Sequence, residues 1–195
     1  MKNLVLDPWQ VRIVNHLVYN EEAFLMVGMG LGKTAAMLSA FKDLLDMGET
    51  RGALVVAPMN VATIQWPLEI EAWEQFSDIR FRIVRGKDCI LEMFDSRPGS
   101  SDLWITNFEQ LTSISDISEL KRFKKKPLPF DMVIWDETTK AKNHSSVRIN
   151  RFRRTIRNRL QKHWGGTGTP MPNSELELFA QCRLLDNGKA LGTGV

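Results

Sequence analysis

The sequence predicts an α/β fold built on a mainly parallel sheet with helices on both faces. Three observations support this prediction. Short apolar runs, each about the length of one strand, alternate along the chain with segments of helical periodicity. Residues 53–57 are apolar at every position, as in strands that helices cover on both faces. A glycine-rich loop joins the first apolar run to a helical segment, which is typical of phosphate-binding α/β domains.

The composition fits one globular domain and excludes several classes of protein. The 195 residues are 43% hydrophobic, which allows a substantial core, and the net charge is only +3, so nucleic-acid binding would depend on clustered charges. Cys89 and Cys182 have no partners at metal-ligand spacing, which favours a reducing, cytoplasmic environment over a disulfide framework. The N-terminal residues lack a signal-peptide pattern and no apolar run reaches membrane-spanning length, so we expect no membrane partner.

The first helix is expected to begin at Asp7, because Pro8 suits the first helical position. Gln10 lies in its first turn. The side-chain amide of Gln10 can both donate and accept a hydrogen bond, as recognition of an adenine edge requires. The plainer interpretation is a capped amphipathic helix without a binding role.

A strand over residues 23–27 leads into the glycine-rich loop. The glycines permit a tight turn that aims backbone N–H groups inward, and the helix from Lys33 to about Met47 adds the partial positive charge of its N-terminus. The alternative is a flexible glycine turn with a solvated lysine. We favour a nucleotide-binding loop, whose predicted ligand residues are Gly28, Met29, Gly30, Leu31, Gly32, Lys33 and Thr34.

The middle of the chain continues the alternation of strands and helices. Asn60 fits the cap of a helix, and Pro67, which lies within that helix, should kink or split it. A dense basic loop occupies residues 121–127, and its plainer interpretation is a solvated surface. The elements predicted in this region are strands over residues 53–57, 80–84 and 103–105, and a short helix over residues 89–94.

An apolar strand over residues 131–135 ends in two adjacent carboxylates, Asp136 and Glu137. Open α/β sheets bind their ligands at this end of the strands. Because successive side chains of a strand point in opposite directions, the chain must bend here if both carboxylates serve one site. The pair resembles a Walker B element, in which Asp136 and Thr34 would hold Mg²⁺ and Glu137 would lie next to the γ-phosphate. Taken alone, the pair would be an ordinary acidic turn.

The last part of the chain is predicted to hold two helices, over residues 145–160 and 175–185. Between them, residues 163–166 lead into residues 167–173, which are interpreted as a loop in which Thr167 and Thr169 flank Gly168. The first helix has two interpretations: a solvated amphipathic helix, or a helix that meets nucleic-acid phosphates. The second interpretation would use some of the four arginines outside its apolar stripe, which are Arg148, Arg151, Arg154 and Arg157.

The order of these segments resembles the first RecA-like domain of superfamily-two helicases, particularly the Swi/Snf-type DNA translocases. The resemblance spans nearly the whole chain. Its compact segments are similar to those of phage or bacterial members, which implies the cytoplasm of a bacterial or phage-infected cell. The matching segments are residues 6–10 (Q motif), 29–34 (motif I), 54–66 (motif Ia), 105–111 (the segment after it), 136–137 with Lys140, Lys142 and Asn143 (motif II), and 167–170 with Asn173 (motif III).

The resemblance implies a site for ATP and Mg²⁺ beside a nucleic-acid surface. Gln10 would select adenine, Lys33 would neutralise the β- and γ-phosphates, and Glu137 would orient and deprotonate the attacking water. Lys33, Asp136 and Glu137 are therefore the implied catalytic residues. Sensing of the γ-phosphate state is implied for Thr167, Gly168 and Thr169. Contacts to nucleic-acid phosphates, with duplex DNA as the expected partner, are implied for Pro58, Asn60, Thr106, Asn107 and Lys140.

The sequence departs from the family pattern in ways that bear on activity. Thr138 and Thr139 stand where motif II usually ends in Gly-His or Ala-His, and Val27 and Gly28 replace the Asp-Glu that usually precedes motif I. We expect residues 1–187 to form one motor lobe and residues 188–195 a tail or truncated linker, without the second RecA-like lobe that supplies the arginine finger. Since that finger accelerates hydrolysis about a thousand- to a hundred-thousand-fold, the chain alone should bind ATP but hydrolyse it slowly.

The favoured function is an ATP hydrolase of the helicase or translocase type, which moves along nucleic acid when a second lobe joins it in cis or in trans. Two alternatives stay open. One is a P-loop ATPase that does not act on nucleic acid, which a test of DNA or RNA binding would separate. The other is a nucleotide-gated interaction module, for which loss of the Glu137 carboxylate would not matter.

Overall fold

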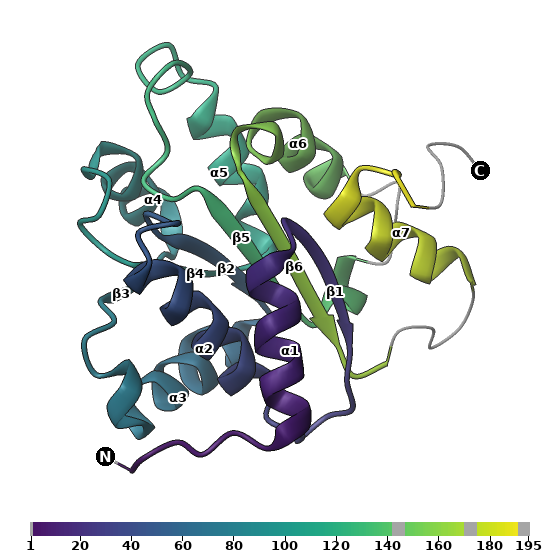
Figure 1. Cartoon of the computed structure of the whole chain (residues 1–195). Helices are drawn as coiled ribbons and strands as arrows, with labels where there is room; N and C mark the ends of the chain where they lie inside the picture. The colour runs from purple at the N-terminus through teal and green to yellow at the C-terminus, as the bar shows by residue number, and fades with distance from the viewer. Residues whose placement is uncertain (1, 142–146, 170–174, 191–195) are drawn as a thin grey trace.

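The computed structural model describes residues 2–141, 147–169 and 175–190, and within these ranges the strands form one six-stranded sheet (Figure 1). All neighbouring strands are parallel, in the order β1-β6-β5-β2-β4-β3. This confirms the predicted α/β fold with a parallel sheet. The strands are β1 (Glu22–Met26), β2 (Ala53–Ala57), β3 (Phe81–Ile83), β4 (Leu103–Asn107), β5 (Met132–Asp136) and β6 (Lys162–Thr167).

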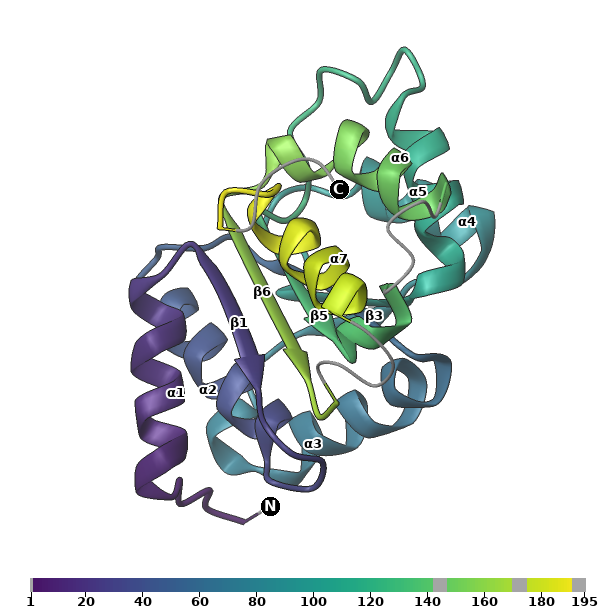
Figure 2. The same cartoon turned by 90° about the vertical axis from the view of Figure 1, so that its right-hand side faces the viewer.

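Helices cover both faces of the sheet, as predicted (Figure 2). Side chains of each central strand alternate between two hydrophobic cores: Val55 and Ile134 belong to one, Val56 and Trp135 to the other. The first core is covered by α1 (Pro8–Tyr19), α2 (Lys33–Asp46) and α3 (Trp66–Ala72), and the second by α4 (Gly86–Asp95), α5 (Leu111–Ser118), α6 (Val147–Thr155) and α7 (Glu175–Asp186). Among the described residues, none of these helices has the length and apolar character that crossing a membrane requires.

The largest difference from the sequence prediction is β6. The sequence predicts a loop over residues 167–173 and no strand directly before it, but residues 162–167 form a strand between β1 and β5. Gly165 and Gly166 disfavour a strand by local propensity, yet packing requires them. A Cβ atom on Gly166 would lie 2.6 Å from Met37 Cε, and one on Gly165 would lie 2.8 Å from Leu185 Cδ1. The two glycines therefore allow α2 and α7 to approach opposite faces of the strand.

Three smaller differences concern helices. Asn60 takes the predicted N-cap position, but its side chain makes no capping bond. A π-helix η1 (Val61–Gln65) follows it and α3 begins at Trp66, which confirms a split near Pro67. The helix predicted over residues 145–160 is described as α6 followed by a 3₁₀ turn, and α5 was not predicted. The 3₁₀ turns are η2 (Glu74–Phe76), η3 (Phe108–Gln110), η4 (Thr138–Ala141) and η5 (Arg157–Arg159).

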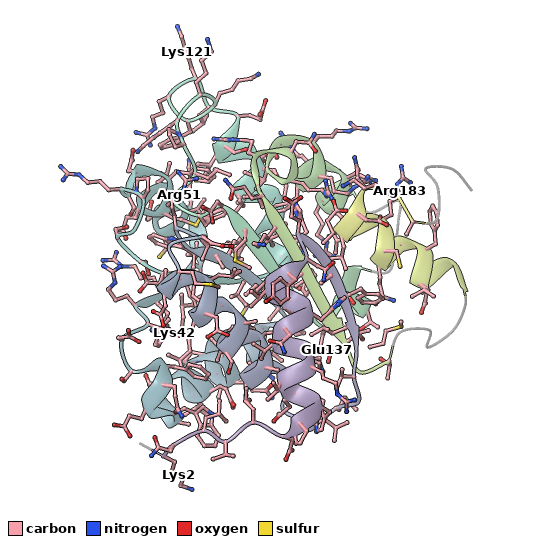
Figure 3. All side chains as sticks on the ribbon, viewed as in Figure 1. Lys2, Lys42, Arg51, Lys121, Glu137 and Arg183 are labelled. Carbon is pink, nitrogen blue, oxygen red and sulfur yellow. The ribbon has the colours of Figure 1, made fainter. Side chains whose placement is uncertain are left out.

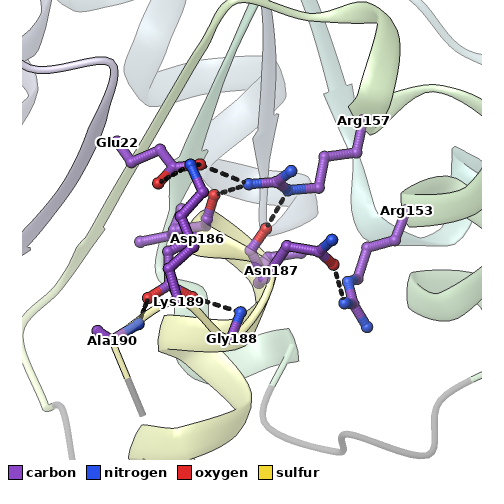
Figure 4. Close-up of polar contacts among 10 residues, drawn as sticks. Glu22, Arg153, Arg157, Asp186, Asn187, Gly188, Lys189 and Ala190 are labelled. Carbon is purple, nitrogen blue, oxygen red and sulfur yellow. Dashed lines mark hydrogen bonds and ion pairs between the residues drawn. The ribbon is translucent and has the colours of Figure 1, made fainter. Parts of the chain in front are cut away.

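A network of charges fastens the end of α7 to the edge strand β1 (Figure 4). Arg157 Nη2 donates to Glu22 Oε1 at 2.9 Å and also to the carbonyl oxygen of Leu185. Lys189 Nζ donates to both carboxylate oxygens of Glu22, each at 2.9 Å. The sequence predicts that Arg157 lies outside the apolar stripe of a helix. In the structure its guanidinium is instead buried in the fold.

His163 on β6 makes the stability of the fold depend on pH. Burial, followed by the positive charge of Arg157, lowers the pKa of His163 from 6.5 to about 4. Below pH 6.5 the unfolded chain therefore binds a proton that the folded chain resists, and the free energy of unfolding falls by about 3 kcal/mol as the pH approaches 4.

Urea denaturation of the wild type and of His163→Asn at pH 7 and pH 4.5 measures this contribution. The wild type is expected to lose about 2–3 kcal/mol more than the variant, because carboxylate titrations are common to both. Equal losses in the two proteins would show that His163 is not the group responsible.

Candidate functional site

The glycine-rich loop connects β1 to α2 at the carboxyl end of the sheet. Gly30 and Gly32 have φ values of +76° and +71°, in the left-handed region that favours glycine. Gly32 immediately precedes the first residue of α2, Lys33. The loop therefore brings several backbone N–H groups to a helix N-terminus, an arrangement that attracts anions.

Lys33 lies inside the site rather than in solvent. Its side chain is buried, and its Nζ donates to the carbonyl oxygen of Val27 at 3.3 Å. The same ammonium lies 4.0 Å from Glu137 Oε1. The predicted loop lysine and the second predicted carboxylate thus face each other across the site.

Asp136, the last residue of β5, is buried beside them. Its Oδ2 accepts a hydrogen bond from Trp66 Nε1 at 3.0 Å. Burial raises the pKa of Asp136, while the Trp66 hydrogen bond and the charge of Lys33 oppose that rise. Trp66 was not predicted as a site residue. A buried indole N–H needs an acceptor, but nothing local in the sequence identifies a carboxylate 70 positions away as that acceptor.

Removing this hydrogen bond should weaken the site without unfolding the protein. We expect Trp66→Phe to cost about 1–3 kcal/mol, because a buried carboxylate loses its donor, and to raise the pKa of Asp136 further. Thermal melting measures the stability, and titration of Mg²⁺ in the presence of nucleotide measures the site. Trp164→Phe is the control for Mg²⁺ binding, since its buried indole donates to the carbonyl oxygen of Asn20 rather than to a residue of this cleft. Equal effects of the two substitutions would contradict a special role for Trp66.

Glu137 shows how two adjacent carboxylates come to serve one site. It follows the last residue of β5 and has a φ of +58°, an uncommon value for a residue with a side chain. The strand therefore bends at this point, as a site shared by both carboxylates requires. Figure 3 places Glu137 near the end of β6.

The threonines predicted to sense the nucleotide lie beside Glu137. Thr167 Oγ1 donates to Glu137 Oε2 at the long distance of 3.5 Å and accepts from the Thr169 N–H at 3.1 Å. Gly168 approaches the glycine-rich loop so closely that a Cβ atom there would lie 2.6 Å from Met29 Cγ. The end of β6 is therefore in contact with both the loop and the second carboxylate.

Gln10 contacts the loop as well. Its Oε1 accepts from the Asp7 N–H at 2.8 Å, and its Nε2 lies 3.4 Å from the carbonyl oxygens of both Leu31 and Gly32. The structure thus places Gln10 at the phosphate loop. Its amide is engaged with the backbone there, so pairing with an adenine would exchange these bonds for new ones.

Lys33, Asp136, Glu137 and the glycine-rich loop line one cleft with a volume of about 500 Å³, whereas Gln10, Trp66 and residues 167–169 are not part of its lining. The π-helix and α3 supply part of its wall, which the sequence did not predict. In the described residues, no group of three or more histidine, cysteine or acidic side chains is arranged to hold a metal. The lining residues are Met29, Gly30, Gly32, Lys33, Thr34, Val61, Gln65, Glu69, Asp136 and Glu137.

Four of the five predicted nucleic-acid residues lie together at or just beyond the ends of β2 and β4, which pair directly. Asn60 is exposed and Pro58 is partly exposed. Thr106 and Asn107 are buried, and the Thr106 hydroxyl donates to the carbonyl oxygen of Val84. Of these four residues, only Pro58 and Asn60 therefore offer surface to a partner. The side chain of Lys140 and the whole of Asn173 lie outside the described part of the chain.

The all-parallel sheet, with a glycine-rich loop and two carboxylates at its carboxyl edge, defines a RecA-like domain. Comparison with known proteins narrows this class. The SNF2-related domain matches residues 9–190, and the chain belongs to that family.

Relatives and solved structures agree with this assignment. The chain is 32% identical to protein p41 of Acyrthosiphon pisum secondary endosymbiont phage 1 over 98% of this chain and 41% of p41. It is 27% identical to human chromodomain-helicase-DNA-binding protein 8 over 93% of this chain and 7% of that protein. The chain thus spans less than half the length of either relative.

The fold is similar to the Sulfolobus solfataricus SWI2/SNF2 ATPase core in complex with dsDNA, with a TM-score of 0.71 and 20% identity over 95% of this chain and 36% of that one. The UvsW helicase of bacteriophage T4 gives a TM-score of 0.65 and 14% identity over 93% of this chain and 59% of that one.

Proposed function

We propose that this chain is the ATP-Mg²⁺-binding motor lobe of a Swi/Snf-type translocase, which hydrolyses ATP to move along nucleic acid when a second RecA-like lobe is joined to it. One observation carries the proposal. In a chain of the SNF2-related family, Lys33, Asp136 and Glu137 meet at the N-terminus of α2 and line one cleft of about 500 Å³.

The triphosphate lies against residues 28–34 in this proposal. Loop N–H groups and the start of α2 supply partial positive charge, and Lys33 supplies a full one. Lys33 exchanges its present contact with Val27 for the β- and γ-phosphates, while the Glu137 carboxylate remains close by. Gln10 lies at the loop, where an adenine could compete for its amide.

The donor set at the cleft fits Mg²⁺. This ion prefers oxygen ligands and usually takes one or two from the protein, with phosphates and water completing an octahedron. The Thr34 hydroxyl and Asp136 carboxylate line the cleft, and Trp66 fixes one oxygen of Asp136. Bound there, Mg²⁺ would supply charge neutralisation at the phosphates.

Glu137 is proposed to act as the general base. Its carboxylate faces the cleft from a bent strand end, so it can accept a proton from water held in front of the γ-phosphate. Thr167 and Thr169 form a hydrogen-bonded chain that ends on the same carboxylate. A change at the γ-phosphate would therefore alter contacts at the end of β6, which makes these residues suitable sensors.

Pro58 and Asn60 at the end of β2 are proposed to face the nucleic acid, with duplex DNA as the expected partner. The Sulfolobus core, which has a similar fold, was solved with dsDNA. Contacts at this edge would go to phosphates and be insensitive to base sequence.

Two measurements on the purified chain test the proposed function. Fluorescent ATP should bind in a Mg²⁺-dependent manner, and duplex DNA should bind with an affinity that falls steeply as salt rises. A flat salt response would contradict tracking along phosphates and favour a P-loop ATPase that does not use nucleic acid. DNA-stimulated turnover at a motor's rate by the chain alone would contradict the need for a second lobe.

A further inference from the structure

The segment between Glu137 and Glu175 is strongly basic. Residues 138–174 contain nine lysine and arginine residues and no aspartate or glutamate. Six of the nine are arginines within or directly after α6. The sequence alone leaves open whether these arginines are merely solvated or contact phosphates. The structure divides them into two sets.

The first set is used within the fold. Arg157 is paired with Glu22, and Arg159 donates to the carbonyl oxygen of Lys126. Arg153 donates to the side chain of Asn187 beyond the end of α7, as Figure 4 shows. These three arginines hold neighbouring segments together, so they are not available to a partner.

The second set faces outward. Arg148, Arg151 and Arg154 are exposed and recur every three residues, which spaces them by about 4.5 Å along the helix axis. We call these three residues the α6 arginine ridge. Arg151 pairs with Asp116 of α5, but both side chains are 47% exposed. An ion pair this exposed is weak, so a phosphate can compete with Asp116 for Arg151.

The ridge is continuous with the surface proposed to bind nucleic acid. Arg148 lines a cleft of about 260 Å³ with Pro58 and Met59 from the end of β2 and Phe108 and Glu109 from the end of β4.

The ridge also borders a second groove further along α6. That groove, of about 440 Å³, is lined by Val147, Asn150, Arg151, Arg154 and Thr155. Arg148 lines the cleft at Pro58, and Arg151 and Arg154 line this second groove. A partner lying across the strand ends at Pro58 would therefore meet Arg148 first and could continue along the ridge.

We propose that the α6 arginine ridge extends the nucleic-acid surface from the strand ends onto the outer face of α6, where its three guanidinium groups bind phosphates of duplex DNA. The inference rests on the proposed function. The chemistry of the groove favours a phosphate backbone over a protein partner, because protein interfaces are centred on apolar or aromatic anchors. In the described lining of the second groove, Val147 is the sole large apolar side chain.

Salt-dependent binding of a duplex of about 30 base pairs tests the ridge on the full chain. The test variant is R148A/R151A/R154A. The control is K121A/K124A/K125A, which removes the same charge from an exposed loop. Figure 3 shows Lys121 at the end of the molecule opposite Glu137, which follows the carboxyl end of β5.

At about 0.1 M salt, the ridge variant should bind the duplex on the order of tenfold more weakly for each phosphate that it no longer neutralises. Its slope of log affinity against log salt should become shallower by about 2 to 3. The control should keep the wild-type slope. Melting curves check folding, and if the triple variant melts early, Arg148→Gln and Arg154→Gln are tested singly, each with an expected decrease of about 1 in slope.

The possible outcomes are distinct. If the wild type binds duplex DNA with a clear salt slope but the ridge and loop variants behave alike, the inference is overturned and the proposed function stands. If the wild type shows no salt-dependent duplex binding, both fail. Competition by poly-glutamate as strong as that of duplex DNA would also overturn the inference, because the ridge would then fit an acidic protein equally well.

Discussion

Replacement of Lys33 by alanine is expected to weaken the binding of ATP strongly. The substitution removes the single full positive charge that the loop brings into the cleft, and a hydrogen bond to a charged group contributes about 1.5–3 kcal/mol. Affinity for ATP should therefore fall on the order of 100-fold. Titration of a fluorescent ATP analogue in the presence of Mg²⁺ measures it.

Lys42→Ala is the matched control for this experiment. Lys42 lies on the same helix, but its ammonium pairs with Asp46 and Asp78 instead of entering the cleft. Its loss should leave ATP affinity unchanged. Melting curves of both variants check that the removal of the buried Lys33 stem has not unfolded the domain. A Lys33→Ala protein that stays folded and binds ATP like the wild type would exclude this cleft as the nucleotide site.

Replacement of Glu137 by glutamine is expected to separate hydrolysis from binding. The amide keeps the shape of the side chain but cannot accept a proton from water. Hydrolysis should therefore fall about a hundred- to ten-thousand-fold, while ATP affinity changes little. Because the chain alone is expected to be slow, single-turnover hydrolysis with the protein in excess over labelled ATP is the appropriate measurement.

Glu71→Gln provides the control, since it makes the same chemical change at an exposed position on α3. Its turnover should equal that of the wild type. If Glu137→Gln hydrolyses ATP normally, Glu137 is not the base. If neither the wild type nor the variant turns ATP over, yet both bind a partner in an ATP-dependent manner, the chain is a nucleotide-gated interaction module.

Most of the fold could be predicted because its signals are local. The apolar run at residues 53–57 and the loop ending in Lys33 and Thr34 each determine their own structure within a few residues. β6 could not be predicted in this way. Glycine is required at positions 165 and 166 because α2 and α7 pack against the strand there. That contact forms only when the chain has folded.

The candidate site likewise has a part that local sequence predicts and a part that it does not. The positions of Lys33, Asp136 and Glu137 follow from motif spacing at the carboxyl edge of a parallel sheet. The Trp66 bond to Asp136 and the burial of Asn107 depend on segments far apart in sequence. Neither feature could be predicted from residue types, because the exposure of a side chain and its hydrogen-bond partner are decided only when the sheet has assembled.

The glycine at position 166 has a consequence for the energetics of ligand binding. Because no side chain stands there, the aliphatic stem of Lys33 lies against the strand, and a Cβ atom would come within 3.0 Å of Lys33 Cδ. A free lysine side chain gives up as much as about 2 kcal/mol of rotamer freedom when it is immobilised. Here most of that freedom is lost when the chain folds, since only 7% of Lys33 stays exposed. The ammonium therefore meets its ligand already ordered, and little conformational entropy opposes binding.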